Sequence, residues 1–209
     1  MTTVNRALER WPGKKELLLE ASWVLELLGR YQAAEGVYRK IIEMDPLETG
    51  ALIDLGLLLE HQGEFGKAVK VYRELLRRDP DYHWALGEIG LCLETLGNTD
   101  AAASSYLQGI EISPDYAFAY YRLAMIQEDE GNPQEALESY NRCVEADPTF
   151  VEAWVAIGLL HEDAGDYTAA ESAYRKALEQ DPDYSWVWGE LGLVLEQQGR
   201  TEEAGLAYE

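Results

Sequence analysis

Residues 86–114 read LGEIGLCLETLGNTDAAASSYLQGIEISP, and the pattern of this stretch recurs along the chain. Its last residue belongs to a series of prolines spaced 34 residues apart: Pro12, Pro46, Pro80, Pro114, Pro148 and Pro182. A constant period of this length is typical of stacked repeats, each of which contacts only its neighbours. The period therefore predicts one elongated array, although a length of 209 residues would by itself suggest one or two globular domains.

The composition excludes several classes of protein. Hydrophobic residues make up 47% of the chain, enough for a continuous core, yet no apolar run approaches the ~18 residues of a membrane span. The first residues, MTTVNRALERW, lack the apolar segment of a signal peptide, and two cysteines are too few for a disulfide framework. A cytoplasmic location is therefore expected.

The net charge of −22 argues against binding to nucleic acid, because the phosphates would be repelled, and it favours basic partners. The acidic residues are unevenly spread, since −20 of this charge lies beyond residue 82. Residues 83–116 contain no lysine or arginine. This asymmetry points to the second half of the chain as the part that meets a basic partner.

Each repeat is expected to contain two helices. When the repeats are aligned from Lys15, the fifteenth residue is always glycine, which ends a helix readily because it adopts a positive φ without steric cost. The proline at the thirty-second residue ends the second helix, because it disfavours the helical conformation of the residue before it. The predicted full repeats are residues 15–48, 49–82, 83–116, 117–150 and 151–184, with half a repeat at 1–14 and an incomplete one at 185–209.

Within these repeats the chain resembles the tetratricopeptide repeat family. The residues that carry the resemblance are clearest in the fifth repeat: Trp154, Ile157, Gly158, Ala170, Tyr174, Ala177 and Pro182. Departures are mild, such as Ser22 at a Gly/Ala position and Ile41 and Leu75 at a position for a small residue. The resemblance implies an all-α fold, a right-handed superhelical solenoid of antiparallel helix hairpins, and a concave face lined by the first helices where partner peptides bind.

By the same resemblance, fixed positions of the first helices line the groove. The candidate peptide-binding residues are Trp84, Gly87, Leu91, Glu94, Phe118, Tyr121, Met125, Glu128, Val155, Leu159, Glu162, Trp186, Gly189, Leu193 and Glu196. The ninth residue of every repeat is apolar, which predicts an apolar floor. Some members of the family bind chaperone carboxylates through a Lys, Asn and Arg clamp, but the corresponding positions here are apolar, aromatic or glycine, so this function is not expected.

The twelfth residue of every repeat is glutamate: Glu26, Glu60, Glu94, Glu128, Glu162 and Glu196. An acid in the last turn of a helix opposes the macrodipole at a cost of roughly 0.3–1 kcal/mol. One interpretation is that the six acids meet Lys or Arg side chains of a partner. The other is that each acid pairs with the backbone or a basic group of a neighbouring repeat and recurs only because the repeat was duplicated.

Gly87 and Gly189 are unusual because each lies in the middle of a predicted helix, three residues after a tryptophan. Glycine there costs about 1 kcal/mol relative to alanine. Either the tryptophan walls a shallow pocket for an apolar anchor of a partner, or a neighbouring side chain such as Tyr121 needs the space.

The sequence offers no catalytic residues, cofactor site or metal site. His61 and His161 occupy different positions in their repeats and lack a second ligand at helical spacing, and Cys92 and Cys143 fall at core positions. We therefore expect a non-enzymatic interaction scaffold whose acidic, apolar-floored groove binds a basic or amphipathic segment of a partner protein. The alternative is a scaffold that self-assembles through terminal helices without a polar cap.

Overall fold

The computed structural model describes residues 14–209. The predicted half repeat at residues 1–14 lies, except for Lys14, outside the described residues. The described part of the chain is helical and contains no strand, so the prediction of an all-α helical solenoid is confirmed. The described residues pack as two compact units, with the boundary between residues 108 and 109, and each unit is described by itself.

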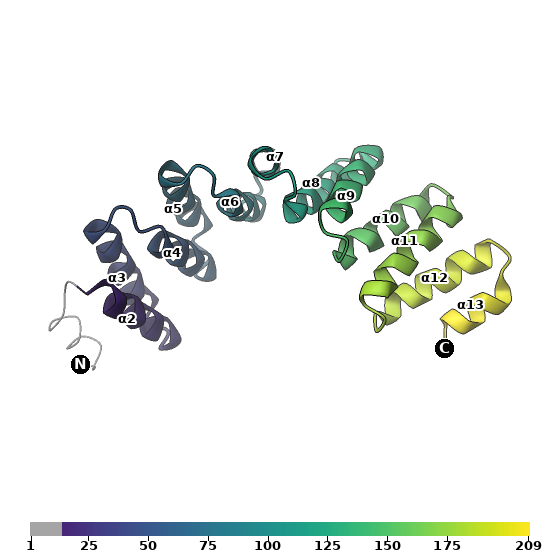
Figure 1. Ribbon diagram of the computed structural model, residues 1–209, viewed down its shortest axis with the longest axis horizontal. Coiled ribbons are helices and arrows are strands. Elements are labelled where there is room, and N and C mark those ends of the chain that lie inside the picture. Colours follow the sequence, from purple (N-terminus) through teal and green to yellow (C-terminus); the bar gives the residue numbers. More distant parts are fainter. Residues whose placement is uncertain (1–13) are drawn as a thin grey trace. The chain divides into compact units, whose positions relative to one another are not determined.

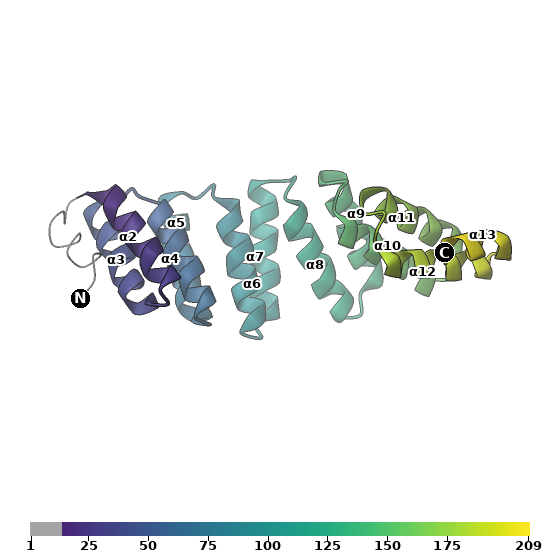
Figure 2. The same ribbon diagram turned by 90° about the horizontal axis from the view of Figure 1, so that it is seen from below.

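Unit 1 contains three first helices and the second helices that follow them. Its helices are α2 (Lys15–Leu27), α3 (Tyr31–Met44), α4 (Gly50–His61), α5 (Phe65–Arg78), α6 (His83–Thr95) and most of α7 (Thr99–Ile112). The first helices α2 and α4 lie along one side, and the second helices α3 and α5 lie along the other (Figure 1). Each first helix contacts the second helix of its own repeat, as α2 does α3 and α4 does α5 (Figure 2).

Unit 2 repeats this arrangement. Its helices, after the last turn of α7, are α8 (Ala117–Asp129), α9 (Pro133–Ala146), α10 (Val151–Asp163), α11 (Tyr167–Gln180), α12 (Ser185–Gln197) and α13 (Thr201–Ala207). In this unit the first helices are α8, α10 and α12. The largest contacts join α8 to α9 and α10 to α11, the two helices of one hairpin.

Each first helix ends as the glycine series predicts. Gly165 has a φ of 75°, and its N–H donates to the carbonyl of Glu162 at 2.8 Å. The N–H of Asp166 donates to the carbonyl of His161, also at 2.8 Å. These two bonds form a Schellman motif, and all six glycines of the series have a positive φ. The second helices α3, α5, α9 and α11 end directly before an Asp-Pro pair, as α11 does before Asp181, and α7 ends before Ser113-Pro114.

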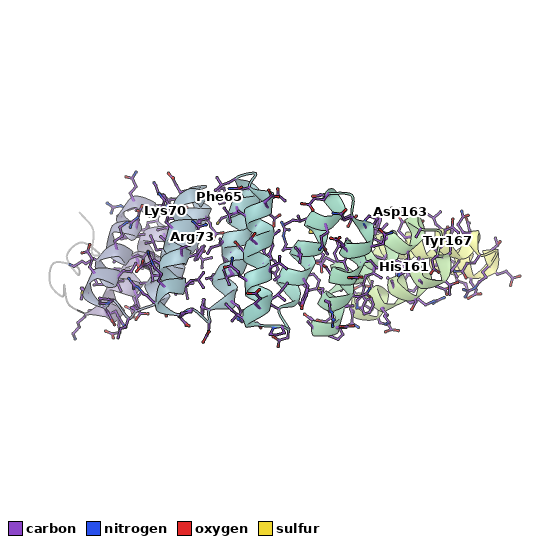
Figure 3. All side chains as sticks on the ribbon, turned by 90° about the horizontal axis from the view of Figure 1, so that it is seen from above. Phe65, Lys70, Arg73, His161, Asp163 and Tyr167 are labelled. Atoms are coloured by element: carbon purple, nitrogen blue, oxygen red, sulfur yellow. The ribbon has the colours of Figure 1, made fainter. Side chains whose placement is uncertain are left out.

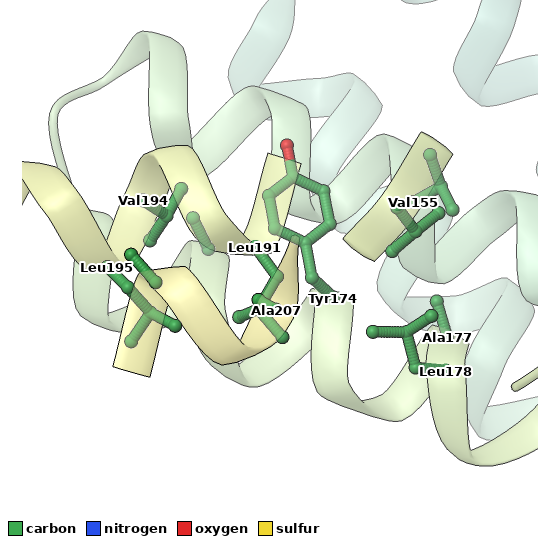
Figure 4. Close-up of a cluster of buried hydrophobic side chains, with 11 residues drawn as sticks. Val155, Tyr174, Ala177, Leu178, Leu191, Val194, Leu195 and Ala207 are labelled. Carbon is green, nitrogen blue, oxygen red and sulfur yellow. The ribbon is translucent and has the colours of Figure 1, made fainter. Parts of the chain in front are cut away.

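The core of each unit is built around the second-helix tyrosine. In unit 1 the ring of Tyr72 lies against Gly56 of α4, so closely that a Cβ at Gly56 would overlap it. Tyr174 of unit 2 packs in the same way on Gly158 and is fully buried among Val155, Leu178 and Leu191 (Figure 4). The small residue of the first helix thus makes room for an aromatic ring of its own repeat.

Candidate functional site

The outward side of the first helices carries exposed apolar side chains, and we call this surface the first-helix face. In unit 1, Trp23 of α2 is 62% exposed and Leu57 of α4 is 44% exposed. Both are ninth residues of their repeats. Side chains of this size are normally buried, so their exposure at matching positions of neighbouring helices marks a surface suited to an apolar ligand.

Unit 2 presents a comparable face. Leu159 of α10 is 37% exposed, and Leu193 and Trp186 of α12 are 45% and 46% exposed. Trp186 and Leu193 are seven residues apart, two helical turns, and therefore share one side of α12. Met125 of α8 is half-buried, and its sulfur accepts a contact from Nη1 of Arg122 at 3.7 Å.

Several of the predicted groove residues are instead engaged in packing. Val155 is buried in the core with Tyr174 and Leu191, so its assignment to the groove is corrected: valine at this position faces the neighbouring repeat. Trp84 is half-buried, with its ring 5.9 Å from that of Tyr72.

Tyr121 and Phe118 are also half-buried. The ring of Tyr121 lies 4.8 Å from that of Phe150 and 5.8 Å from that of Tyr140. Phe118 lies 6.0 Å from Tyr116. These aromatic side chains help to hold neighbouring helices together and leave only part of each ring for a ligand.

The two mid-helix glycines differ from each other. A Cβ at Gly189 would meet no atom within 4 Å, so the space beside this glycine is open. It belongs to a cleft of about 580 Å³ between α12 and α13, which Trp188 and Tyr208 also line. Gly87 is buried.

The glutamate series has a partner inside its own repeat. The tyrosine twelve residues later donates its hydroxyl to the carboxylate, at 2.5 Å from Tyr38 to Glu26 and at 2.8 Å from Tyr174 to Glu162. The other pairs of this kind are Tyr72–Glu60, Tyr106–Glu94 and Tyr140–Glu128. Burial, and the neighbouring carboxylate after it, raise the pKa of Tyr174. The glutamate therefore satisfies a hydroxyl that would otherwise be buried without a partner.

Several of these glutamates interact electrostatically with a second carboxyl group on the next first helix, 28 residues later. Glu60 of α4 and Glu88 of α6 form such a pair, and burial followed by the charge of Glu60 raises the pKa of Glu88 to about 7. Burial also raises the pKa of Glu60 itself. Neither forms an ion pair with a cation of the described residues.

The same relation recurs twice. Burial and then the charge of Glu26 raise the pKa of Asp54 in unit 1, and burial and then the charge of Glu162 raise that of Glu190 in unit 2. A cation placed between the members of a pair would relieve their repulsion. The first-helix face thus combines apolar side chains with carboxyl pairs that are short of positive charge.

Sequence reasoning missed both relations, although the sequence contains their signal. The spacing of twelve between each glutamate and a tyrosine is constant, and Asp54, Glu88 and Glu190 share the sixth position of their repeats. Trp23 and Leu57, ninth residues of their repeats, are more exposed than Leu91 or Met125.

The described residues contain no group of three or more His, Cys, Asp or Glu side chains placed to hold a metal ion. His161 and Asp163 lie in the last turn of α10, and Tyr167 begins α11 (Figure 3). Burial raises the pKa of the Cys92 and Cys143 thiols to about 12, which makes them poor nucleophiles. Over residues 14–209 no helix has the length and apolar character needed to cross a bilayer.

Two family comparisons match the sequence. Residues 84–209 match the family described as Cilia and flagella-associated protein 70 C-terminal domain, and residues 25–88 match a tetratricopeptide repeat family. No curated protein matches the chain with significant similarity.

Solved structures of similar fold are numerous. A crystal structure of MamA is 24% identical, with a TM-score of 0.65 over 77% of this chain and 87% of that one. YrrB, described as a tetratricopeptide repeat protein with an unusual peptide-binding site, is 19% identical, with a TM-score of 0.62 over 89% of this chain and 96% of its own. PilF of Pseudomonas aeruginosa is 17% identical, with a TM-score of 0.71 over 98% and 91%. At these identities the likeness concerns the fold.

Proposed function

The chain belongs to the tetratricopeptide repeat family, and over residues 84–209 to the family of the Cilia and flagella-associated protein 70 C-terminal domain; from this premise we propose that its first-helix face binds a basic, amphipathic segment of a partner protein. A fold of this kind supports a protein–protein interaction scaffold. Our specific proposal is that the ligand is a basic segment with apolar side chains that contact this face. We also propose that the protein is located in the cytoplasm.

One observation carries this proposal: carboxyl pairs without a cation stand beside exposed apolar side chains. On α4, Leu57 and Glu60 are three residues apart and share one side of the helix. Glu88 approaches Glu60 from α6. An arginine or lysine of a ligand would lie between the two carboxyl groups, while an apolar side chain next to it would cover Leu57.

Unit 2 offers the same combination. Leu159 and Glu162 share one side of α10, and Glu190 approaches Glu162 from α12. The exposed Leu193 and Trp186 extend the apolar surface along α12. YrrB, of similar fold, is described as having a peptide-binding site, which agrees with peptide binding here.

The test exchanges Glu60, Glu162 and Glu190, which belong to these carboxyl pairs, for glutamine. Glutamine keeps an oxygen that accepts the tyrosine hydroxyl bond, so the fold is retained while the charge is removed. The control exchanges Glu111, Glu145 and Glu179, exposed acids of the second helices, for glutamine.

Both variants and the wild type are used to retain proteins from a cell extract at low and at moderate salt. We expect a basic protein to be retained by the wild type and the control, to be lost from the first variant, and to be released by salt. Equal retention by all three chains would remove the glutamates from the binding mechanism.

A second candidate function is self-association through α13. Leu206 is 71% exposed and Tyr208 is 48% exposed, and both line the open cleft beside Gly189. Light scattering over a range of concentrations distinguishes the two functions. A constant mass of 23.6 kDa would exclude self-association.

A further inference from the structure

A cleft on the opposite side of unit 1 has the reverse electrical character. It lies between the second helices α3 and α5, with α4 as its floor, and has a volume of about 420 Å³. We call it the second-helix cleft. Its rim carries the following cations: Arg39, Lys67, Lys70, Arg77 and Arg78. Only Glu43 and Glu74 among its lining residues are acidic, whereas the whole chain has a net charge of −22.

The floor of the second-helix cleft is apolar. Its apolar lining residues are Ile42, Leu52, Leu55 and Val71. Leu52 and Leu55 belong to the core, and Ile42 is partly exposed at the wall of the cleft. A ligand that fits this cleft therefore has acidic groups for the rim and an apolar group for the floor.

Four of the rim cations pair with an acid close to them in the sequence: Arg39 with Glu35, Lys67 with Glu64, and Arg77 and Arg78 with the shared Glu74. Arg78 donates from Nε to Glu74 at 3.2 Å, and its Nη1 is buried without a hydrogen-bond partner among residues 14–209. Lys70 is the exception. It is exposed and forms no ion pair with a described acid, and it lies beside Arg73 on α5 (Figure 3). Lys70 therefore leaves positive charge on the rim that no acid of the described residues neutralises.

The fold does not require these cations. The residues at the place of Lys67 in the other repeats are Ala33, Ala101, Glu135, Ala169 and Glu203, and those at the place of Lys70 are Gly36, Ser104, Glu138, Ser172 and Leu206. The place of Arg77 is held by Glu43, Glu111, Glu145 and Glu179, and that of Arg78 by Met44, Ile112, Ala146 and Gln180. None of these residues is basic. Four cations have therefore been gathered in one repeat and on one cleft.

Unit 2 contains the same cleft four repeats later, which serves as an internal comparison. It has a volume of about 210 Å³ and is lined by Arg175, Leu178, Glu179, Trp188 and Leu191. The first three of these occupy the places of Arg39, Ile42 and Glu43. Here Glu203 and Leu206 stand where unit 1 has Lys67 and Lys70, so this cleft lacks the cationic rim.

We propose that the second-helix cleft of unit 1 binds an acidic segment of another protein through carboxylates on its cationic rim and an apolar side chain on its floor. Charge complementarity indicates an acidic ligand, because the rim of the cleft is cationic although the chain as a whole is strongly acidic. The apolar floor favours a peptide, which can supply an apolar side chain next to its carboxylates, over a nucleic acid. This site is independent of the first-helix face, so one can fail without the other.

The test measures fluorescence anisotropy of a labelled peptide in which glutamates surround two leucines at helical spacing. The binding variant is Lys67→Glu with Lys70→Glu, both at exposed positions of α5. The control is Arg142→Glu with Lys176→Glu, which makes the same change of charge on exposed residues of α9 and α11. Circular dichroism confirms that each variant is folded.

We expect the wild type and the control to bind the peptide with similar affinity and the binding variant to bind about tenfold more weakly. Added salt should weaken binding, and exchange of the leucines for serine should weaken it further. Equal binding by all three chains, or no binding by the wild type, would overturn the proposal.

Two further measurements exclude other occupants. Tighter binding of an oligothymidylate than of the peptide would assign the cleft to nucleic acid. A wild-type dimer in sedimentation that becomes a monomer in the Lys67→Glu, Lys70→Glu variant would assign it to a second copy of the chain. Either result would contradict the proposal.

Discussion

Removal of the Tyr174 hydroxyl would measure how much a tyrosine–glutamate hydrogen bond contributes to stability. The hydroxyl donates to Glu162 at 2.8 Å from a fully buried ring. Tyr174→Phe leaves the ring in place and removes the bond, and hydrogen bonds to charged groups contribute about 1.5–3 kcal/mol. Because Glu162 is partly exposed to water, we expect a loss of about 1 kcal/mol in the free energy of unfolding, measured by urea denaturation.

Tyr208→Phe provides the matched control for this variant. Tyr208 holds the same position in the last repeat, but its side chain is 48% exposed. We expect a change below about 0.5 kcal/mol. Equal losses in the two variants would show that the bond to Glu162 has no special role.

The carboxyl group of Glu88 makes the stability of unit 1 depend on pH. Its pKa of about 7 in the folded chain lies above the ordinary value of 4.5, chiefly because of burial and then because of Glu60. A raised pKa in the folded state means that this group's contribution to stability is present at low pH and is lost as the pH rises from about 4.5 through about 7. After allowance for solvent screening the loss is on the order of 1–2 kcal/mol.

Glu88→Gln should therefore stabilise the chain at pH 8 and leave it nearly unchanged at pH 4. Urea denaturation at the two pH values measures this difference. The control is Glu20→Gln, at the same position of the first repeat, where the side chain is exposed. An effect of Glu88→Gln that is independent of pH would contradict the assignment.

For individual residues, the sequence predicts only part of the candidate site. The exposure of Leu159, Leu193 and Trp186 agrees with the groove positions, since these residues lie on the outward side of their helices. The burial of Val155 could not be predicted, because the fifth position holds residues as different as Gly87 and Tyr121 and its environment depends on the neighbouring repeat. The sequence shows the glutamates only as charges, because their role as acceptors depends on the packing of the second helix against the first.

The close approach of α4 and α5 depends on a glycine. Gly56→Ala would place a Cβ into the ring of Tyr72, which is fixed by burial, so we expect a loss of about 1–3 kcal/mol. Gly66, in the exposed part of α5, has no atom near its Cβ position. Gly66→Ala should therefore stabilise the chain by roughly 0.5–1 kcal/mol.

Thermal unfolding followed by circular dichroism measures both variants. The comparison separates helix propensity, which favours alanine at both positions, from the packing of the two helices, which opposes it at Gly56 alone. Similar melting temperatures for the two variants would mean that the tyrosine ring moves without cost.

The C-terminus of helix α8 carries acidic residues, which interact unfavourably with the helix dipole. Asp129 is the last residue of this helix and Glu130 follows it, both exposed, and the last turn contains no basic residue. Asp129→Asn with Glu130→Gln should stabilise unit 2 by about 0.3–1 kcal/mol for each charge removed. Glu135→Gln, in the first turn of α9, should have the opposite sign because an acid there favours the dipole. Chemical denaturation that gives the same sign for both variants would exclude the dipole as the cause.

The helices themselves could be predicted closely from the sequence. Glycine at the fifteenth residue and proline at the thirty-second act locally, through a positive φ and through a clash with the preceding residue, so their effect does not depend on the rest of the fold. The division into two compact units could not be predicted. The period of 34 residues passes through the boundary at residues 108 and 109 without interruption, and that boundary lies inside α7.

The charge of the whole molecule opposes its folding. Against 39 acidic residues the chain has 17 basic ones, so the ion pairs that form, such as Arg39–Glu35 and Arg175–Glu171, leave most acids unpaired. Exposed pairs of this kind contribute only about 0–1 kcal/mol each. Repulsion among the remaining carboxylates should therefore exceed the attraction in the pairs, and both are screened by salt.

We therefore expect the melting temperature to rise when sodium chloride is increased from about 0.05 to about 0.5 M, as the Debye length falls from more than 10 Å to less than 5 Å. A variant with Glu130, Glu138 and Glu179 exchanged for glutamine carries less charge and should show a smaller rise. A melting temperature that falls with salt would mean that the ion pairs outweigh the repulsion. In that case charge repulsion would not lower the stability of the chain. Binding a cation would then relieve little repulsion among the unpaired carboxyl groups of the first-helix face.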